Sequence, residues 1–455
     1  MLPIMAQVAV SDNLKLDINY RQILSISLPI SFAMLVPQFN YLINSFFLAR
    51  LGPGFLGAAG ITGVYYLIFS VVGFGLNNGL QALISRRAGQ DRLQDIGSLF
   101  VQSIYLTLGI SVFGILLTYL IAPMILQKVI DPELYQQADS FLKIRIFGLP
   151  FLYLYQMRNA LMVGTNQSKL LIWGTLAETL SNVFLDYALI FGHFGFPRLG
   201  FNGAAWASIS AEFIGMMSMY FIIHWKGLGK RFRLFADMSF KPEQMKLLFT
   251  QSSPLVLQYA ISIISWEFFF ILISHHGRLA LDISQFMRLM MGFFGVIIWA
   301  FAATSTTMVS NIIGQGLQDR VVQLINRIAG LSFGITISIL LILQFFPATL
   351  LGFIQDQPEF VREGIPVFRI VCFGIALMSV SSVWLNSVIG TGNTKVNLLI
   401  EFITIIAYSI YIYLVLSYWK LPITWGWASE ILYWLSMLSM SFWYIRSGRW
   451  KGTMV

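Results

Sequence analysis

Twelve apolar segments of helical length follow one another along the chain, and this pattern constrains the fold more than any other feature. They cover about residues 22–48, 55–84, 97–122, 140–163, 170–192, 203–224, 247–274, 284–312, 328–346, 364–389, 396–417 and 422–445. A membrane-spanning helix needs roughly 20 apolar residues, so 455 residues leave no room for a large extramembrane domain. With 57% hydrophobic and 11% charged residues, the chain is predicted to be an all-α polytopic membrane protein with twelve transmembrane helices.

The distribution of basic residues predicts the orientation of these helices. With the N-terminus placed inside, the inner connections carry 18 of the 29 Lys and Arg residues, and the outer loops carry six. Cytoplasmic loops are enriched in these residues. We therefore expect cytoplasmic tails at 1–21 and 447–455 and a cytoplasmic linker at 226–246. The net charge of +9 then reflects membrane topology, and no nucleic-acid partner is expected.

The two halves of the chain repeat each other. Pro29 to Gly52 and Pro254 to Gly277 both span 23 residues, and Gly148 to Gly164 and Gly374 to Gly390 both span 16. Six spans per repeat is an even number, so both copies start on the same side of the membrane. An axis along the membrane normal then relates the two copies, as in two-lobed alternating-access transporters.

We accordingly predict an N-lobe at 22–225 and a C-lobe at 247–446, joined by the linker. A membrane enzyme would need a nucleophile or a metal cluster that these spans do not offer, so an enzyme is not expected. No GxxxxGK[ST] loop occurs in the sequence, so no nucleotide and no cofactor are implied. The energy for transport would come from an ion gradient.

Several motifs in a fixed order carry a family resemblance. They are Leu28-Pro29, Arg50-Leu51-Gly52, Asn182–Gly192 (NVFLDYALIFG), Pro197–Ser208 (PRLGFNGAAWAS), and the glycine turns after the fourth and tenth spans. Over nearly the whole chain these motifs resemble the multidrug and toxic compound extrusion (MATE) family. The major facilitator superfamily shares the six-plus-six repeat, but its basic-glycine-acidic loop is not obvious in Ser85–Arg92.

A stripe of polar residues on the fifth span is the strongest candidate for ion coupling. Glu178, Asn182 and Asp186 stand at i, i+4 and i+8, so they share one helix face. Intramembrane acids are costly and mark functional sites. The alternative is a structural role, with Lys143, Arg145 or Arg158 of the fourth span pairing with these acids.

The internal repeat favours ion coupling over packing. The positions equivalent to the stripe in the second half are Thr404, Tyr408 and Ile412, so the copy has lost the acids. A scaffold requirement would be present in both halves. We therefore expect a single ion site in the N-lobe.

The resemblance implies roles for individual residues of this site. In many MATE proteins the residues matching Asn182 and Asp186 belong to the cation site, and Ser208 falls where a threonine often contributes. Asn44 occupies the place of an aspartate on the first span of many relatives, so the site has lost a charge. This loss favours H⁺ at Asp186, while Na⁺ at Asp186 and Asn182 remains the alternative.

Other residues are assigned to substrate binding and gating. Glu267 and Trp266 of the seventh span, with Gln156 and Asn159 of the fourth, are expected to contact a cationic substrate, and a second cation site in the C-lobe is left open. Pro29 and Pro37 interrupt the hydrogen bonding of the first span. The family reading is that this span bends when the N-lobe is protonated. No metal site is expected at His275 and His276, which lack further ligands at metal spacing.

Taken together, these features predict a monomeric inner-membrane antiporter. It would export organic, mostly cationic compounds, as in drug or toxin efflux, in exchange for H⁺ or Na⁺. The alternative on a related fold is an exporter or flippase of a lipid-linked substrate or a metabolite.

Overall fold

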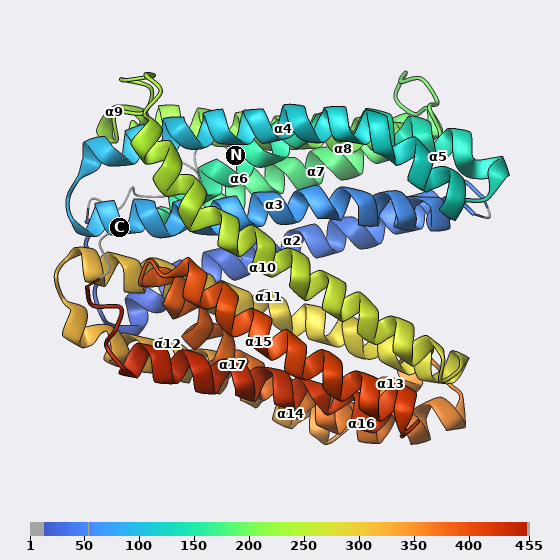
Figure 1. Ribbon diagram of the computed structural model, residues 1–455. Coiled ribbons are helices and arrows are strands. Elements are labelled where there is room, and N and C mark those ends of the chain that lie inside the picture. The colour runs from blue at the N-terminus through green and yellow to red at the C-terminus, as the bar shows by residue number, and fades with distance from the viewer. Residues whose placement is uncertain (1–12, 53, 453–455) are drawn as a thin grey trace. The chain divides into compact units, whose positions relative to one another are not determined.

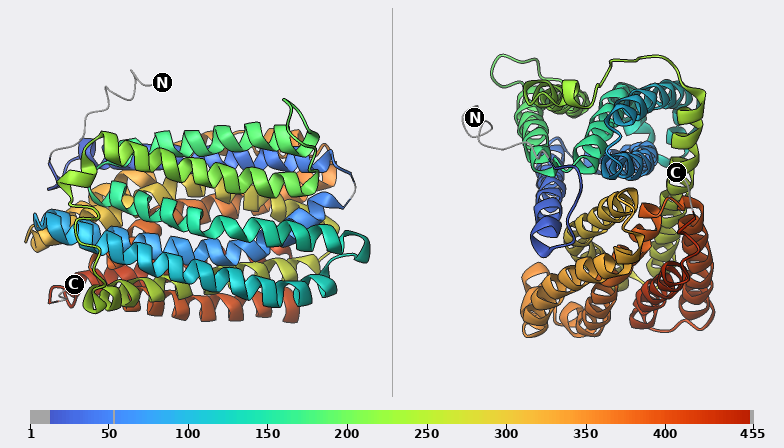
Figure 2. Two further views of the ribbon diagram at one scale, coloured as in Figure 1. Left: turned by 90° about the horizontal axis from the view of Figure 1, so that it is seen from above. Right: turned by 90° about the vertical axis from the view of Figure 1, so that its left-hand side faces the viewer.

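The computed structural model describes residues 13–52 and 54–452, and these residues form helices and connecting turns without any β-strand (Figure 1). The helices divide into two compact units. The first unit contains Leu28–Val256, and the second contains Lys15–Ser27 together with the chain from Leu257 onward. Within each unit the helices run along a roughly common direction (Figure 2).

The first unit is a bundle in which long helices pack lengthwise. α7 packs along α8, α3 packs along α6, and α6 also contacts α4 and α8. The elements are α2 (Tyr20–Ala49), α3 (Phe55–Gly89), α4 (Leu93–Val129), α5 (Pro132–Arg145), η1 (Ile146–Gly148), α6 (Leu149–Gly164), η2 (Ser168–Leu170), α7 (Leu171–Phe191), α8 (Phe201–Trp225), α9 (Leu228–Arg231) and the beginning of α10 (Pro242–Ser274).

The second unit is organised around α14, which packs against α11, α12 and α17, while α15 packs against α17. Its core is rich in aromatic side chains, including Phe269, Phe294, Phe368 and Trp427. Besides the rest of α10, the elements are α11 (Arg278–Gly314), η3 (Gln318–Arg320), α12 (Val321–Gln344), α13 (Pro347–Ile354), α14 (Pro358–Gly390), α15 (Thr394–Ile412), η4 (Tyr413–Tyr418), α16 (Ile423–Trp427) and α17 (Ser429–Arg446).

The predicted fold class is confirmed. Each of the twelve apolar segments is helical, and nine helices of the described chain are long and apolar enough to cross a membrane. The expected spans beyond these nine are α7, whose polar stripe dilutes its apolar character, and the shorter α6 and α17. Large apolar side chains such as Phe113, Leu120 and Met124 of α4 are exposed on the surface. Such faces suit lipid rather than water, and the protein is a multi-pass membrane protein.

The fourth apolar segment differs from expectation, because the predicted uninterrupted helix over 140–163 is wrong. The chain forms α5, a 3₁₀ turn over Ile146–Gly148, and then α6. Pro150 lies in the first turn of α6, where its missing N–H leaves no helical hydrogen bond unmade. The break lets Arg145, at the end of α5, reach a partner on α8, which is described below.

Two helices change unit along their length, and each does so next to a proline. α2 passes from the second unit to the first between Ser27 and Leu28, beside Pro29, and α10 passes between Val256 and Leu257, beside Pro254. The units therefore differ at these helices from the lobes predicted at 22–225 and 247–446. The tails at 1–21 and 447–455 lie partly outside the described residues, and their cytoplasmic location stays a prediction.

The connector at 226–246 is docked on α4 of the first unit. Gln102 donates a hydrogen bond to the Ser239 carbonyl at 2.9 Å and accepts one from the Lys241 amide at 3.1 Å. Tyr105 donates to the Met238 carbonyl at 2.6 Å. The connector is thus attached to α4 by specific hydrogen bonds.

Candidate functional site

The polar stripe predicted on the fifth span lies on α7, as the helical spacing required. Asn182 and Asp186 are buried, with 4% and 0% of their surface exposed, and Glu178 is half-buried. α7 ends one turn later because Gly192 adopts a left-handed conformation, with φ of +79°. Asp186 is therefore held in a regular helical turn near the end of α7.

The carboxylate of Asp186 has no hydrogen-bonding partner within the described chain. Both of its oxygen atoms are buried, and neither accepts a hydrogen bond or forms an ion pair. An isolated buried carboxylate strongly disfavours its charged form. Such a group is stabilised by binding a proton or a cation.

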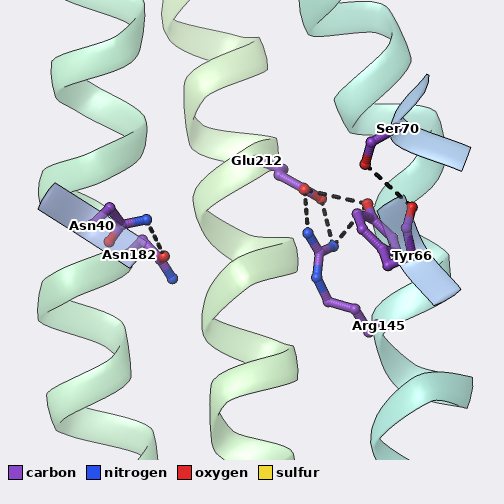
Figure 3. Close-up of polar contacts among 6 residues, drawn as sticks. All are labelled: Asn40, Tyr66, Ser70, Arg145, Asn182 and Glu212. Atoms are coloured by element: carbon purple, nitrogen blue, oxygen red, sulfur yellow. Dashed lines mark hydrogen bonds and ion pairs between the residues drawn. The ribbon is translucent and has the colours of Figure 1, made fainter. Parts of the chain in front are cut away.

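Asn182, one turn before Asp186 on α7, is hydrogen-bonded to α2. The Asn40 amide donates a hydrogen bond to Asn182 Oδ1 at 2.6 Å (Figure 3). α2 and α7 are the first and fifth of alternating spans and run in the same direction, so Asn44, one turn beyond Asn40, is expected to lie near Asp186, one turn beyond Asn182. The side-chain oxygens of Asn40 and Asn44 are buried and accept no hydrogen bond. The candidate site thus consists of Asn40, Asn44, Asn182 and Asp186.

Asn40 was missed from the sequence. A usable signal was present, because Asn40 and Asn44 stand one turn apart and so mark one polar face of the first span.

The basic residues that could have neutralised the stripe have other partners. Lys143 forms an ion pair with Asp139 at 2.6 Å, and Arg145 pairs with Glu212. Arg158 is buried with its guanidinium carbon 5.7 Å from the centre of the Tyr220 ring. In the described chain none of the three pairs with Glu178 or Asp186, so the structural alternative for the stripe lacks its proposed contacts.

A buried ion pair joins the end of α5, next to the break before α6, to α8. Arg145 Nη2 and Nη1 approach Glu212 Oε1 and Oε2 of α8 at 2.6 and 2.9 Å (Figure 3). Arg145 Nη1 also donates to the Tyr66 hydroxyl at 2.9 Å, and the guanidinium carbon lies 3.8 Å from the centre of that ring. A side-chain carbon at Gly148 would meet Arg145 Nη1 and Glu212 Oε2 at less than contact distance, so a larger residue here would have to displace the ion pair.

The other predicted residues of the first unit lie outside this arrangement. Ser208 is half-buried on α8 and forms no hydrogen bond with Asp186. Gln156 is buried on α6 against Gly73 of α3. Asn159 is half-buried on α6, and its side-chain oxygen accepts no hydrogen bond. Their roles in cation or substrate binding stay predictions.

The predicted substrate residues of the second unit have partners of their own. Glu267 forms an ion pair with Arg288 of α11 at 2.9 Å. Trp266 packs edge-on against Trp427, with ring centres 6.0 Å apart. A cationic substrate at Glu267 would have to compete with Arg288.

The second half lacks the stripe at the equivalent positions but contains a buried polar cluster of its own. Position by position Thr404 does stand where Glu178 does in the first half, but a buried acid, Glu401, lies one turn earlier on α15 and accepts hydrogen bonds from α10 and α17. The repeat offset could not reveal this shift, because it compares only equivalent positions.

No grouping of three or more His, Cys, Asp or Glu side chains that could hold a metal ion occurs among the described residues. His276 contacts the Leu416 carbonyl at 2.8 Å. The oxygens that lack partners near Asp186 are carboxylate and amide oxygens, which suit a proton or a hard monovalent cation.

Known proteins with similar sequences are multidrug resistance proteins. The MatE family model matches residues 29–188 and 254–415. The chain is 24% identical to the probable multidrug resistance protein NorM of Synechocystis sp., over 78% of this chain and 79% of the relative. It is 22% identical to the corresponding protein of Thermotoga maritima, over 95% and 93%.

Solved structures show the same fold. A MOP superfamily transporter from Pyrococcus furiosus aligns with a TM-score of 0.87 at 16% identity, covering 98% of this chain and 100% of that one. An outward-facing multidrug resistance MATE family transporter aligns with a TM-score of 0.86 at 16% identity, covering 96% and 98%.

Proposed function

Because this chain belongs to the MatE family of transporters, we propose that it exports organic, mostly cationic compounds in exchange for H⁺ bound at Asp186. The family predicted from the sequence motifs is confirmed, and with it the prediction of a transporter rather than an enzyme. The observation that carries the proposal is the Asp186 carboxylate, which is fully buried and has no partner on either oxygen. In drug or toxin efflux driven by an ion gradient, such a carboxylate can bind and release the coupling ion.

Coupling follows from what a proton does to this carboxylate. Protonated Asp186 is neutral and tolerated in an apolar interior, whereas ionised Asp186 needs a cation, water or a donor. A conformation that admits water favours the ionised form, and one that excludes water favours the protonated form. A cationic substrate that stabilises the ionised form therefore competes with the proton, and each ligand shifts the population toward the conformation it prefers.

The first span is the element most directly able to respond. Asn40 ties α2 to Asn182, one turn from Asp186, so a change at Asp186 alters the surroundings of this bond. α2 contains Pro29 and Pro37 and changes unit beside Pro29. Each proline removes a backbone hydrogen bond and makes a helix easier to bend. We assign these prolines to gating on this basis.

H⁺ is favoured over Na⁺ because the site holds one carboxylate. Asn44, which we expect near Asp186 on α2, is a neutral residue, so a desolvated Na⁺ would be neutralised by a single charge. A proton forms a covalent O–H bond with one carboxylate oxygen and needs no further ligands. Na⁺ at Asp186 and Asn182 remains the alternative that the experiment must test.

The experiment imposes each gradient separately on everted membrane vesicles and measures export of ethidium. Wild-type protein is expected to respond to a proton gradient and Asp186→Asn to give no response, while Asp139→Asn, which alters an acid paired with Lys143, behaves as wild type. Export driven only by the Na⁺ gradient would show that Na⁺, and not H⁺, is the coupling ion. Unchanged proton-driven export by Asp186→Asn would contradict the proposed role of Asp186.

A second candidate function is export of an anionic lipid-linked compound or metabolite, and Arg158 is the observation that favours it. This guanidinium is buried and its Nη1 has no hydrogen-bonding partner. Arg145 and Arg288 are already paired with acids, so among these three arginines of the described chain Arg158 is the one whose Nη1 could bind an anion. Loss of transport in Arg158→Gln, with the response to cations retained, would support this candidate.

We further propose that the protein acts as a monomer in the inner (plasma) membrane with both termini in the cytoplasm. The basis for the orientation is the basic-residue distribution along the sequence. Cysteine accessibility at an introduced residue in the 226–246 connector, measured in intact cells and in everted vesicles, tests the orientation.

A further inference from the structure

The second unit contains a buried carboxylate that the proposed coupling site does not use. Glu401 on α15 has 1% of its surface exposed. Its Oε1 accepts hydrogen bonds from Ser262 Oγ at 2.6 Å and from Tyr433 Oη at 2.5 Å, and its Oε2 accepts one from Gln258 Nε2 at 3.2 Å. Glu401 therefore joins three helices, α10, α15 and α17.

No basic side chain accounts for this buried acid. Within the described residues, no Lys, Arg or His forms an ion pair with Glu401. The ionisable group in direct electrostatic contact with Glu401 is Tyr433 of α17. Tyr433 also interacts with Glu430, which accepts a hydrogen bond from Trp434 at 3.0 Å and interacts with Tyr408 of α15. On α10 the nearest acid along the helix, Glu267, is paired with Arg288. Structural neutralisation by a cationic side chain is thus absent here.

The hydrogen bonds around Glu401 satisfy both the ionised and the protonated form. When Glu401 is ionised, the Ser262 hydroxyl donates to its Oε1. Ser262 Oγ also lies 2.8 Å from the Gln258 carbonyl, so the hydroxyl has a second acceptor on its own helix. When Glu401 is protonated, the new O–H on Oε1 donates to Ser262 Oγ, and the Ser262 hydroxyl turns to that carbonyl. One hydroxyl rotation therefore accommodates the proton without moving the helices.

Two buried side-chain oxygens without hydrogen-bonding partners flank Glu401 along α15. Asn397 and Thr404 stand at i−4 and i+3 from Glu401, are 0% and 1% exposed, and carry side-chain oxygens that accept no hydrogen bond. Thr404 also lines a pocket of about 370 Å³ between α15 and α17. Asn397 and Thr404 thus place unpartnered oxygens one turn before and one turn after Glu401 along α15, and Thr404 also lines the pocket.

We propose that Glu401 is a second proton-exchanging site, in which the carboxylate binds and releases H⁺ during the transport cycle. In the step itself an O–H bond forms on Oε1 with a proton delivered by water, and it breaks to return that proton to water. The inference rests on the proposed function for its role in transport, but the protonation of Glu401 does not depend on Asp186.

As a consequence, the strength of the hydrogen bonds that attach α10 to α15 depends on whether Glu401 is protonated. Gln258 and Ser262 follow Pro254 and the point after Val256 where α10 changes unit. Ionised Glu401 attracts the donors of both side chains more strongly than neutral Glu401 does, because hydrogen bonds to a charged acceptor are stronger. Deprotonation therefore tightens the attachment of α10 to α15, and protonation loosens it.

Infrared difference spectroscopy of the full-length protein in lipid nanodiscs, between acid and alkaline pH, tests this inference. The wild type is expected to show protonated-carboxyl bands, one of which disappears in Glu401→Gln and persists in Asp186→Asn. Ser262→Ala and Tyr433→Phe should shift the frequency of that band without removing it, because each removes one hydrogen bond to the same oxygen. These two variants keep the test decisive if Glu401→Gln does not fold.

Glu267→Gln is the matched control, since Glu267 lies in the same unit and is paired with Arg288. It should leave the Glu401 band in place. The inference would be overturned if the spectrum of Glu401→Gln kept every protonated-carboxyl band of the wild type. It would also be overturned if neither Ser262→Ala nor Tyr433→Phe shifted the band assigned to Glu401. A band that responds to added NaCl at constant pH would overturn it in favour of Na⁺. A band that disappears in Glu401→Gln, together with no band that depends on Asp186, would support the inference and count only against the proposed coupling site.

Discussion

Asn40 of α2 and Asn182 of α7 share a hydrogen bond of 2.6 Å, one helical turn before the partnerless carboxylate of Asp186. The bond joins the two helices at this level, and Asn44 and Asp186 each follow one turn later on their own helix. It also makes the position of α2 depend on the surroundings of Asp186. In the second unit α10 and α15, the counterparts of α2 and α7 in the repeat, are likewise joined through a buried side chain, Glu401.

The first prediction concerns the strength of the Asn40–Asn182 bond. In a double-mutant cycle with Asn40→Ala and Asn182→Ala, we expect a coupling free energy of unfolding of about 0.6–1.5 kcal/mol, as for interhelical hydrogen bonds in membranes. Reversible unfolding in mixed detergent micelles measures it. The pair Asn44→Ala with Asn182→Ala serves as control and should be additive. Additivity of the Asn40 cycle as well would mean that the two amides do not interact.

The second prediction concerns the glycine at the α5–α6 break. Gly148→Ala would push a methyl group into Arg145 and Glu212 and separate their buried ion pair. The expected destabilisation approaches the roughly 3–5 kcal/mol cost of breaking such a pair, and thermal unfolding followed by tryptophan fluorescence measures it.

Gly60→Ala is the matched control, because Gly60 lies inside α3 and an added carbon there meets open space. It should be neutral or stabilising by about 0.5–1 kcal/mol, the usual gain for Gly to Ala in a helix. Equal melting temperatures for the two variants would show that the ion pair does not depend on the glycine.

The third prediction concerns the acid dependence of the 226–246 connector. Hydrogen bonds from Lys241 and Ser239 lower the pKa of the Asp237 carboxyl. A group whose pKa is lower in the folded state stabilises that state above its unfolded pKa, and this contribution disappears as the pH falls through the folded pKa. The connector should therefore loosen only in strong acid, which pepsin cleavage rates over a series of acidic pH values measure. Asp237→Asn should remove the additional acid dependence while Glu243→Gln retains it, and identical profiles for the two variants would exclude Asp237 as the cause.

The sequence was sufficient for the fold because its strongest signals are local. Twelve apolar runs and helical spacing predict the helices and place Asn182 and Asp186 on one buried face. One exception is the break at Ile146–Gly148, where a continuous apolar run conceals a turn next to Pro150 and to the ion pair between Arg145 and Glu212. Another is the turn at Ala428, which separates α16 from α17.

The partners of the candidate residues could not be predicted, since they depend on the rotation and register of neighbouring helices. Several long-range partners were open to Arg145, and the sequence does not say that Glu212 is the one it binds. In the same way Asn40, rather than Asn44, faces Asn182. Ion pairing of Glu267 with Arg288 also needed the structure, because the two residues lie on different helices, 21 positions apart.

The most direct test of the account is the number of protons released when purified protein in weakly buffered nanodiscs binds tetraphenylphosphonium, followed with a pH-indicating dye. If substrate and proton compete at Asp186, the wild type releases protons on binding and Asp186→Asn releases one fewer per bound cation. The same proton release from Asp186→Asn and from the wild type, at equal occupancy, would contradict the account.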